Sequence, residues 1–237
     1  MIKRIAEARL KKLASAFRSV AVVGPRQSGK TTLCRLVFPG KPYISLENPD
    51  TLEFAQTDPR GFLAQFKKGA ILDEAQKAPH LFSYLQQVLD ETKKKGLFIL
   101  TGSNNFLLQE NITQTLSGRI AYLQLLPLSL QELKNSKKIK ADYGWHIITG
   151  GYPEVIAKKI APADWYAGYL NTYVERDVRQ LKNISNLSQF SKLLRLCAGR
   201  TGQILNMTSL GNDCGIDQKT VTAWLAILQS SFIIYLL

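Results

Sequence analysis

Apolar residues in the first half of the chain form short runs that alternate with segments of helical periodicity. The apolar runs predict buried strands at residues 19–23, 43–46, 70–73, 97–101 and 120–126. Apolar positions three and four residues apart predict helices at residues 3–18, 29–38, 51–67 (with a break around Pro59), 80–95 and 106–116. Strands that alternate with helices indicate an α/β fold with a parallel sheet.

The pattern changes after Pro127, where strand signals fade and helical periodicity dominates. Helices are predicted at residues 129–136, 152–159, 163–182 and 187–199. We therefore expect three parts: a sheet domain over residues 1–130, a helical, lid-like region over 131–185, and a final segment over 186–237.

A glycine-bounded loop joins the first predicted strand to the helix that follows it. Gly24 and Gly29 permit backbone angles that other residues resist, so the N–H groups of the loop can turn inward. A strand, such a loop and a helix start, in this order, are typical of a phosphate-binding P-loop. The expected binding residues are Gly24, Pro25, Arg26, Gln27, Ser28, Gly29, Lys30, Thr31 and Thr32. Lys30 would reach the β- and γ-phosphates and the Thr31 hydroxyl would hold Mg²⁺, unless the match is a chance loop.

Two acidic residues end the third predicted strand. Ligands of parallel sheets bind at the carboxyl ends of the strands, so Asp73 and Glu74 are expected near the loop. Asp73 would hold the metal through a water, and Glu74 would polarise an attacking water as a catalytic residue. The alternative interpretation is an acidic cap on the next helix.

Further candidates follow the fourth strand and precede the fifth. The fourth strand ends in Thr101-Gly-Ser-Asn104, where Asn104 or Ser103 could contact the γ-phosphate or the water; the alternative is a simple turn. A guanidinium near the γ-phosphate would stabilise charge in the transition state, which makes Arg119 the first candidate and Arg176 the second. For each arginine the alternative is a structural ion pair.

Net charge and composition restrict the partners. The chain carries 31 basic and 18 acidic residues, a formal net charge of +13, which favours polyanions such as nucleotides, nucleic acid or an acidic protein surface. No apolar run approaches the length that crosses a bilayer, and the charged N-terminus is unlike a secretory signal. The three scattered cysteines form neither a metal-spaced cluster nor a disulfide framework, so we expect a cytoplasmic protein.

The last part of the chain has the pattern helix, glycine turn, helix. Asp217 can cap the second helix, with Val221, Leu225 and Leu228 facing inward. Gln218, Lys219 and Thr222 would face outward, as in a recognition helix, so residues 205–229 are a candidate DNA-binding segment. Residues 232–237 would then form the first wing strand of a winged helix. Packing against protein alone is the alternative role.

The ordered series of motifs resembles one family. Its members are prokaryotic AAA+-superfamily ATPases that join an ATPase module to a winged-helix segment and a C-terminal domain of unknown function. The matching motifs lie at residues 24–32, 72–77, 100–104, 116–119, 150–154 and 173–177. The resemblance implies ATP rather than GTP, Mg²⁺, and a P-loop NTPase sheet of order 5-1-4-3-2, with the strand before Asn104 between those of the P-loop and Asp73. Members usually continue well beyond this length, so we expect a shortened chain and assign it no nuclease activity.

These observations lead to two hypotheses. The first is an ATPase in which Mg-dependent ATP hydrolysis drives a conformational change, with a homo-oligomer as a candidate assembly and the arginine coming from the same or a neighbouring chain. The alternative is a nucleotide-gated DNA-binding or regulatory module with slow hydrolysis. No membrane partner is expected.

Overall fold

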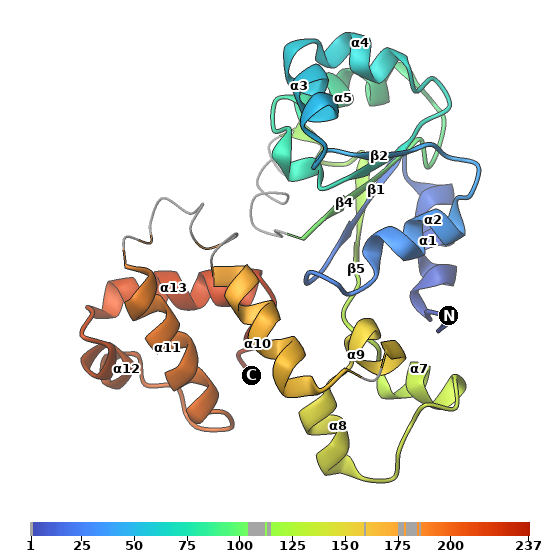
Figure 1. The fold of residues 1–237 in the computed structure, drawn as a ribbon. Coiled ribbons are helices and arrows are strands. Elements are labelled where there is room, and N and C mark those ends of the chain that lie inside the picture. The colour runs from blue at the N-terminus through green and yellow to red at the C-terminus, as the bar shows by residue number, and fades with distance from the viewer. Residues whose placement is uncertain are drawn as a thin grey trace. The chain divides into compact units, whose positions relative to one another are not determined.

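The computed structural model describes residues 2–103, 112, 115–158, 160–174, 178, 184 and 186–237 (Figure 1). The chain folds into two compact units, residues 1–158 and 159–237, which are described separately.

The first unit is built on a five-stranded parallel sheet (Figure 1). Its strands are β1 (Ser19–Val23), β2 (Tyr43–Ser45), β3 (Ile71–Asp73), β4 (Phe98–Gly102) and β5 (Ile120–Gln124). The spatial order β2-β3-β4-β1-β5 is the predicted order 5-1-4-3-2 read from the other edge, so this prediction is confirmed. Because all strands run the same way, their carboxyl ends meet at one edge of the sheet.

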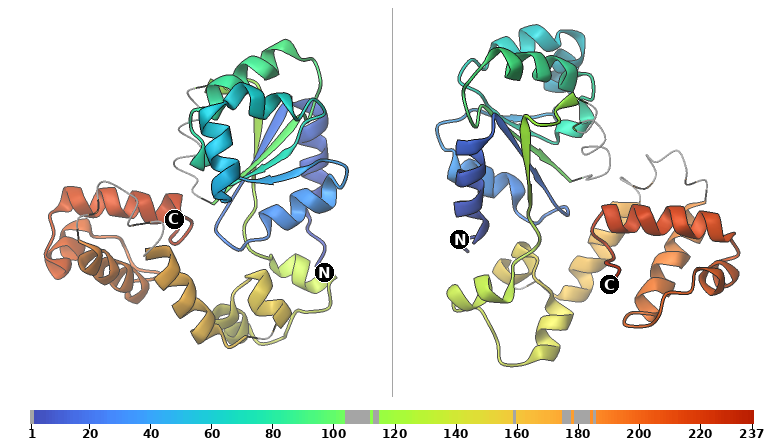
Figure 2. Two further views of the ribbon diagram at one scale, coloured as in Figure 1. Left: turned by 45° about the horizontal axis from the view of Figure 1, so that its top comes forward. Right: turned by 180° about the vertical axis from the view of Figure 1, so that it is seen from behind.

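Helices cover both faces of the sheet (Figures 1 and 2). One face packs against α1 (Ala6–Ala16) and α2 (Lys30–Val37), the other against α3 (Pro49–Thr57), α4 (Pro59–Ala64) and α5 (Leu81–Glu91). Along β1, Val20 and Val22 join the α1–α2 core, whereas Ala21 and Val23 join the opposite core. A parallel strand covered on both faces has no polar side, which explains why β1 reads as a continuous apolar run.

Polar caps and proline divide the segment after β2 into two helices. Asn48 accepts a hydrogen bond from the Thr51 N–H at 3.2 Å and starts α3, and Asp58 accepts one from the Gly61 N–H at 2.8 Å and starts α4. Pro59 takes the first position of α4, where its missing N–H costs nothing. The predicted break around Pro59 is confirmed.

The first unit continues past residue 130, where sequence analysis places a boundary. It includes α7 (Leu130–Asn135), α8 (Tyr143–Thr149) and α9 (Pro153–Lys158). The Leu128 N–H donates to the Gly151 carbonyl at 2.7 Å, and Leu128, Leu133 and Ile156 share a small core. These contacts hold the three short helices to the end of the sheet domain.

The second unit is helical (Figure 2). Its helices are α10 (Pro162–Tyr173), α11 (Leu187–Gly199), α12 (Met207–Cys214) and α13 (Gln218–Ser230). Phe190 of α11 meets Trp224 of α13 with ring centroids 5.3 Å apart, inside a core that includes Leu193 and Val221. Residues 232–237, all described, form no strand, so the predicted wing strand is wrong. A strand needs a hydrogen-bonding neighbour, and none of the described segments pairs with this one.

Candidate functional site

The loop between β1 and α2 has the backbone that the glycines predict. Gly24 has φ +152° and Gly29, which precedes α2, has φ +93°. A Cβ on Gly24 would lie 2.1 Å from the Leu125 carbonyl oxygen, so only glycine fits there. The loop therefore runs from the end of a buried strand into the N-terminus of a helix, where N–H groups have no helical partners.

The loop suits a negatively charged ligand. Lys30 is 6% exposed, and its Nζ donates to the carbonyls of Gly24 (3.0 Å) and Pro25 (2.7 Å). Burial lowers the pKa of Lys30, while the charges of Glu74 and Asp73 oppose that effect in part. The Ser28 hydroxyl is buried and has no hydrogen-bond partner among the described residues. A buried ammonium and an orphaned hydroxyl in one loop fit a ligand rich in acceptor oxygens.

Asp73 lies at the end of β3, beside the start of α2. Its carboxylate accepts hydrogen bonds from the Thr31 hydroxyl at 3.0 and 3.2 Å, from the Tyr43 hydroxyl at 2.7 Å, and from the Thr101 hydroxyl. The pKa of Tyr43 is raised to about 12, mainly by burial and in second place by the hydrogen bond to Asp73. The predicted pair Thr31 and Asp73 is brought together at the carboxyl edge of the sheet.

This pair fits Mg²⁺. The ion binds hydroxyl and carboxylate oxygens and keeps several waters, so it needs few protein ligands. Within the described part of the chain, no three His, Cys, Asp or Glu side chains gather to make a metal site. Thr31 and Asp73 would hold the ion, which would neutralise phosphate charge.

Sequence reasoning missed Tyr43 and Thr101 as partners of Asp73. Tyr43 opens β2 and Thr101 lies in β4, the two strands that flank β3. Thr101 carries a usable signal in the sequence, because it is a hydroxyl residue directly after the apolar run over residues 97–100. Tyr43 carries none, since an aromatic residue in a strand normally indicates packing.

Glu74 adopts a left-handed backbone conformation, with φ +54° and ψ +46°, directly after β3. Such a conformation is uncommon for a non-glycine residue and is enriched at active sites and ligand-binding loops. Its Oε2 accepts hydrogen bonds from the Ser103 hydroxyl at 2.9 Å, from the Ser103 N–H at 3.3 Å and from the Gln76 amide. Gln76 belongs to a short 3₁₀ helix, η1 (Ala75–Lys77). Glu74 and Ser103, which sequence analysis named for separate roles, thus meet at the same edge, and Asn104 lies outside the described residues.

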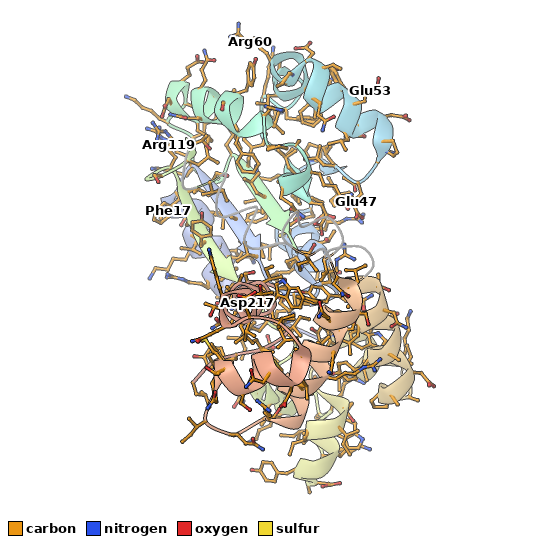
Figure 3. The ribbon with its side chains drawn as sticks, turned by 90° about the vertical axis from the view of Figure 1, so that its left-hand side faces the viewer. Phe17, Glu47, Glu53, Arg60, Arg119 and Asp217 are labelled. Carbon is orange, nitrogen blue, oxygen red and sulfur yellow. The ribbon has the colours of Figure 1, made fainter. Side chains whose placement is uncertain are left out.

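The structure does not bring Arg119 to the phosphate loop of its own chain. Its guanidinium pairs with Asp90, with Nε–Oδ1 at 2.5 Å and Nη2–Oδ2 at 2.9 Å. Its carbonyl accepts from the Ser19 N–H, which places it at the amino edge of the sheet, about 16 Å from the loop by the rise along β1. In Figure 3, Arg119 lies on the other side of the first unit from Glu47, which follows the carboxyl end of β2. For Arg119 the structure thus shows the alternative interpretation, a structural ion pair. Arg176 lies outside the described residues.

The second unit contains the predicted helix–turn–helix. Gly215, with φ +72°, separates α12 from α13, and Asp217 caps α13 by accepting from the Thr220 N–H at 2.9 Å. Gln218, Lys219 and Thr222 are exposed, whereas Val221, Leu225 and Leu228 are buried.

None of the helices in the described ranges has the length and apolar character to span a membrane.

Two families of protein domain match the chain. Residues 16–134, half of the chain, match the AAA domain, and residues 140–237 match a domain of unknown function. An uncharacterized protein of Mycobacterium tuberculosis is 30% identical over 237 residues, which cover 98% of this chain and 52% of the relative. An uncharacterized protein of Haemophilus influenzae is 23% identical over 150 residues, 58% of this chain and 38% of the relative. The chain thus spans about half the length, or less, of these curated relatives.

Solved structures share the fold. The Walker-type ATPase of Pyrococcus abyssi has a TM-score of 0.56 and 15% identity, with 98% of this chain and 90% of that one covered. The ORC2 protein of Aeropyrum pernix, in its ADPNP–ADP complexes, has a TM-score of 0.57 and 16% identity, with 98% and 87% covered. The parallel sheet, the glycine-bounded loop and the family match agree: the chain belongs to the AAA domain family and has the fold of a P-loop ATPase.

Proposed function

We propose that the protein binds ATP with Mg²⁺ and hydrolyses it, and that the reaction drives a conformational change. The observation that carries the proposal is the convergence of Lys30, Thr31, Asp73 and Glu74 at the carboxyl edge of one sheet. These side chains come from two separate segments of the chain, and a buried lysine whose pKa is lowered by burial, against the opposing charges of two nearby carboxylates, is typical of a functional site.

Each side chain has a role that its position supports. The loop amides and Lys30 bind the phosphates, and Lys30 exchanges its bonds to Gly24 and Pro25 for bonds to phosphate oxygens. Thr31 and Asp73 hold the magnesium ion, which supplies charge neutralisation at the phosphates when bound. Glu74 orients the attacking water and accepts its proton at a carboxylate oxygen.

The position of Arg119 bears on the source of the guanidinium and on the assembly. Because this arginine pairs with Asp90 at the amino edge, a guanidinium for the γ-phosphate would have to come from elsewhere, either Arg176 or a neighbouring copy. We propose a homo-oligomer in which a neighbouring chain completes the site, working in the cytoplasm, where the free thiols of Cys34, Cys197 and Cys214 stay reduced.

Calorimetry and a turnover assay test the proposal together. The parent protein should bind MgATP and release phosphate, and Lys30→Ala should lose about 100-fold in affinity, as expected for removal of a buried phosphate-binding charge. Glu74→Gln should keep nucleotide binding and lose about 10²- to 10⁴-fold in turnover, because the amide cannot accept the proton. Arg60→Ala is the control, since Arg60 is exposed on α4 at the far end of the unit (Figure 3). Absence of MgATP binding by the parent, or parent-like turnover in Lys30→Ala, refutes the proposal.

A second candidate function is a nucleotide-gated DNA-binding module with slow hydrolysis. It is favoured by the exposed Gln218, Lys219 and Thr222 on α13 and by the net charge of +13. A fluorescent duplex titrated with the protein, with and without MgATP, tests it, with Lys219→Ala as the informative variant. The module is supported if the affinity for the duplex depends on MgATP and is weakened by Lys219→Ala. Rapid ATP turnover that does not change when DNA is added argues against it.

A further inference from the structure

Arg4 joins four separate parts of the first unit through one guanidinium. Its Nη1 donates to the Ser28 carbonyl at 2.7 Å, and its Nη2 donates to the Leu126 carbonyl at 2.6 Å. Its Nε pairs with Glu132 at 3.0 Å, and the two side chains are only 10% and 5% exposed. A nearly buried arginine thus connects the segment before α1, the loop between β1 and α2, the chain just after β5, and α7.

Glu132 is held in place independently of Arg4. Its Oε1 accepts from the Ile5 N–H at 2.8 Å, and its Oε2 accepts from the Ser129 N–H at 2.9 Å within the capping box of α7. Burial alone raises the pKa of Glu132, but these backbone bonds and the Arg4 guanidinium outweigh it and leave the pKa below its usual value. The carboxylate therefore stays charged and orients the guanidinium toward the loop.

The contact with Ser28 acts on a peptide group of the loop between β1 and α2. The Ser28–Gly29 peptide is trans and planar, so its C=O and N–H groups point in opposite directions. Arg4 also lies close to Gly29, since a Cβ on that residue would be 3.6 Å from its Nη1. Because Arg4 binds the Ser28 carbonyl, the Gly29 N–H points away from Arg4, and the adjacent positive charge makes it a stronger donor.

We propose that Arg4 is a positioning residue of the nucleotide site: paired with Glu132, it fixes the Ser28–Gly29 peptide so that the Gly29 N–H faces the phosphates. This inference rests on the proposed function. Glycine at position 29 has no side chain to resist rotation of the Ser28–Gly29 peptide. Arg4, from outside the loop sequence, restrains that rotation by binding the Ser28 carbonyl. Nothing in the motif over residues 24–32 specifies such an anchor, because the arginine comes from the N-terminal segment.

Binding measurements on matched variants test the proposal. Arg4→Ala should weaken MgATP binding about 10- to 100-fold, the effect of losing a charged hydrogen bond that orients a phosphate donor. Arg4→Lys keeps the charge but cannot bridge three acceptors, so it should lie between Arg4→Ala and the parent. Leu133→Ala serves as the stability control, because Leu133 is buried in α7 and contributes only packing. Arg60→Ala serves as the charge control.

A spectroscopic readout separates positioning from general destabilisation. The Gly29 amide resonance should shift on addition of MgADP in the parent, in Arg60→Ala and in Leu133→Ala, and this shift should be lost in Arg4→Ala. Arg4→Ala binding within about twofold of the parent, or an equal loss of affinity in Leu133→Ala, overturns the proposal. If Arg4→Ala does not fold, Arg4→Lys decides, and parent-like affinity in that variant overturns it. Absence of binding in the parent overturns the proposed function first, and this inference with it.

Discussion

Replacement of Gly24 by alanine tests whether close packing, as well as nucleotide chemistry, requires glycine at the start of the loop. The added Cβ would lie 2.1 Å from the Leu125 carbonyl oxygen, where ordinary contact begins at 3.4 Å, so the two must separate by about 1.3 Å (3.4 minus 2.1). Leu125 cannot move freely, because it is 2% exposed and its N–H donates to the Val23 carbonyl at 2.7 Å. The variant must therefore distort the junction between β1 and the chain after β5.

The expected cost has two parts. Overpacking a filled site costs about 1–3 kcal/mol. The positive φ of +152° at Gly24 adds a steric penalty, of the order of 1–2 kcal/mol for an L-residue in a left-handed conformation. The opening free energy of the sheet should thus fall by about 2–5 kcal/mol, a large share of the 5–15 kcal/mol of a typical domain.

Two other glycines provide matched controls. Gly118 has φ +75° but no described atom within 4 Å of an added Cβ, so Gly118→Ala should cost only the conformational penalty, about 1–2 kcal/mol. Gly40 has neither a positive φ nor a neighbour in the way among the described residues, and Gly40→Ala should change stability by less than about 0.5 kcal/mol.

Hydrogen exchange of the β4 amides, which pair with β1, is the appropriate assay, because a single melting temperature is ill-defined for a chain with two compact units. A loss of 2–5 kcal/mol accelerates exchange about 30- to 4,000-fold. Should Gly24→Ala exchange no faster than Gly118→Ala, the clash with Leu125 is not a determinant of the loop and the packing argument is wrong.

Three further predictions follow from other contacts of the first unit. Thr101→Val removes a hydroxyl donor from the buried Asp73 carboxylate and should cost about 1–3 kcal/mol in β4 hydrogen exchange, and a neutral result would contradict the role given to this bond. Because the folded pKa of Glu132 lies below its usual value of 4.5, its stabilisation is present above pH 4.5 and is lost as the pH falls through the folded pKa. Hydrogen-exchange rates recorded from pH 6 to pH 3 should show this loss of stability in the parent protein but not in Glu132→Gln. Arg119→Ala should leave the affinity for MgATP within about twofold, because its partner Asp90 lies at the amino edge; a tenfold loss measured by calorimetry would place this arginine in the site after all.

The sheet could be read almost completely from local sequence. Each predicted strand is present within one or two residues at its ends, since runs of apolar residues between glycine, proline and charged positions leave little choice of conformation. Helix α8 was missed because it is short and exposes Tyr143, Ile147 and Ile148, so its apolar positions do not form an inward stripe. The strand order came from the resemblance to a family, as local pattern carries no information on which strands are neighbours.

The candidate site also has residues that sequence alone could name and residues that it could not place. Sequence alone could name Lys30, Thr31, Asp73 and Glu74 as candidates, because a loop with two glycines and an acidic strand end are contiguous patterns whose chemistry depends on neighbours in the chain. Arg119 was misplaced relative to the loop of its own chain, because an arginine at a strand start looks the same whether it faces a phosphate or Asp90.

The amino-acid sequence by itself determined the five strands of the sheet, most of the helices, the loop between β1 and α2, and the residue types that a nucleotide requires, because these depend on side chains close together in the chain. Only the tertiary structure decided which distant groups support them: Tyr43 and Thr101 on Asp73, and Arg4 with Glu132 behind the loop. Their contacts span 24 to 128 positions of the chain, and contacts at such separation depend on strand register and helix packing, which no local pattern encodes.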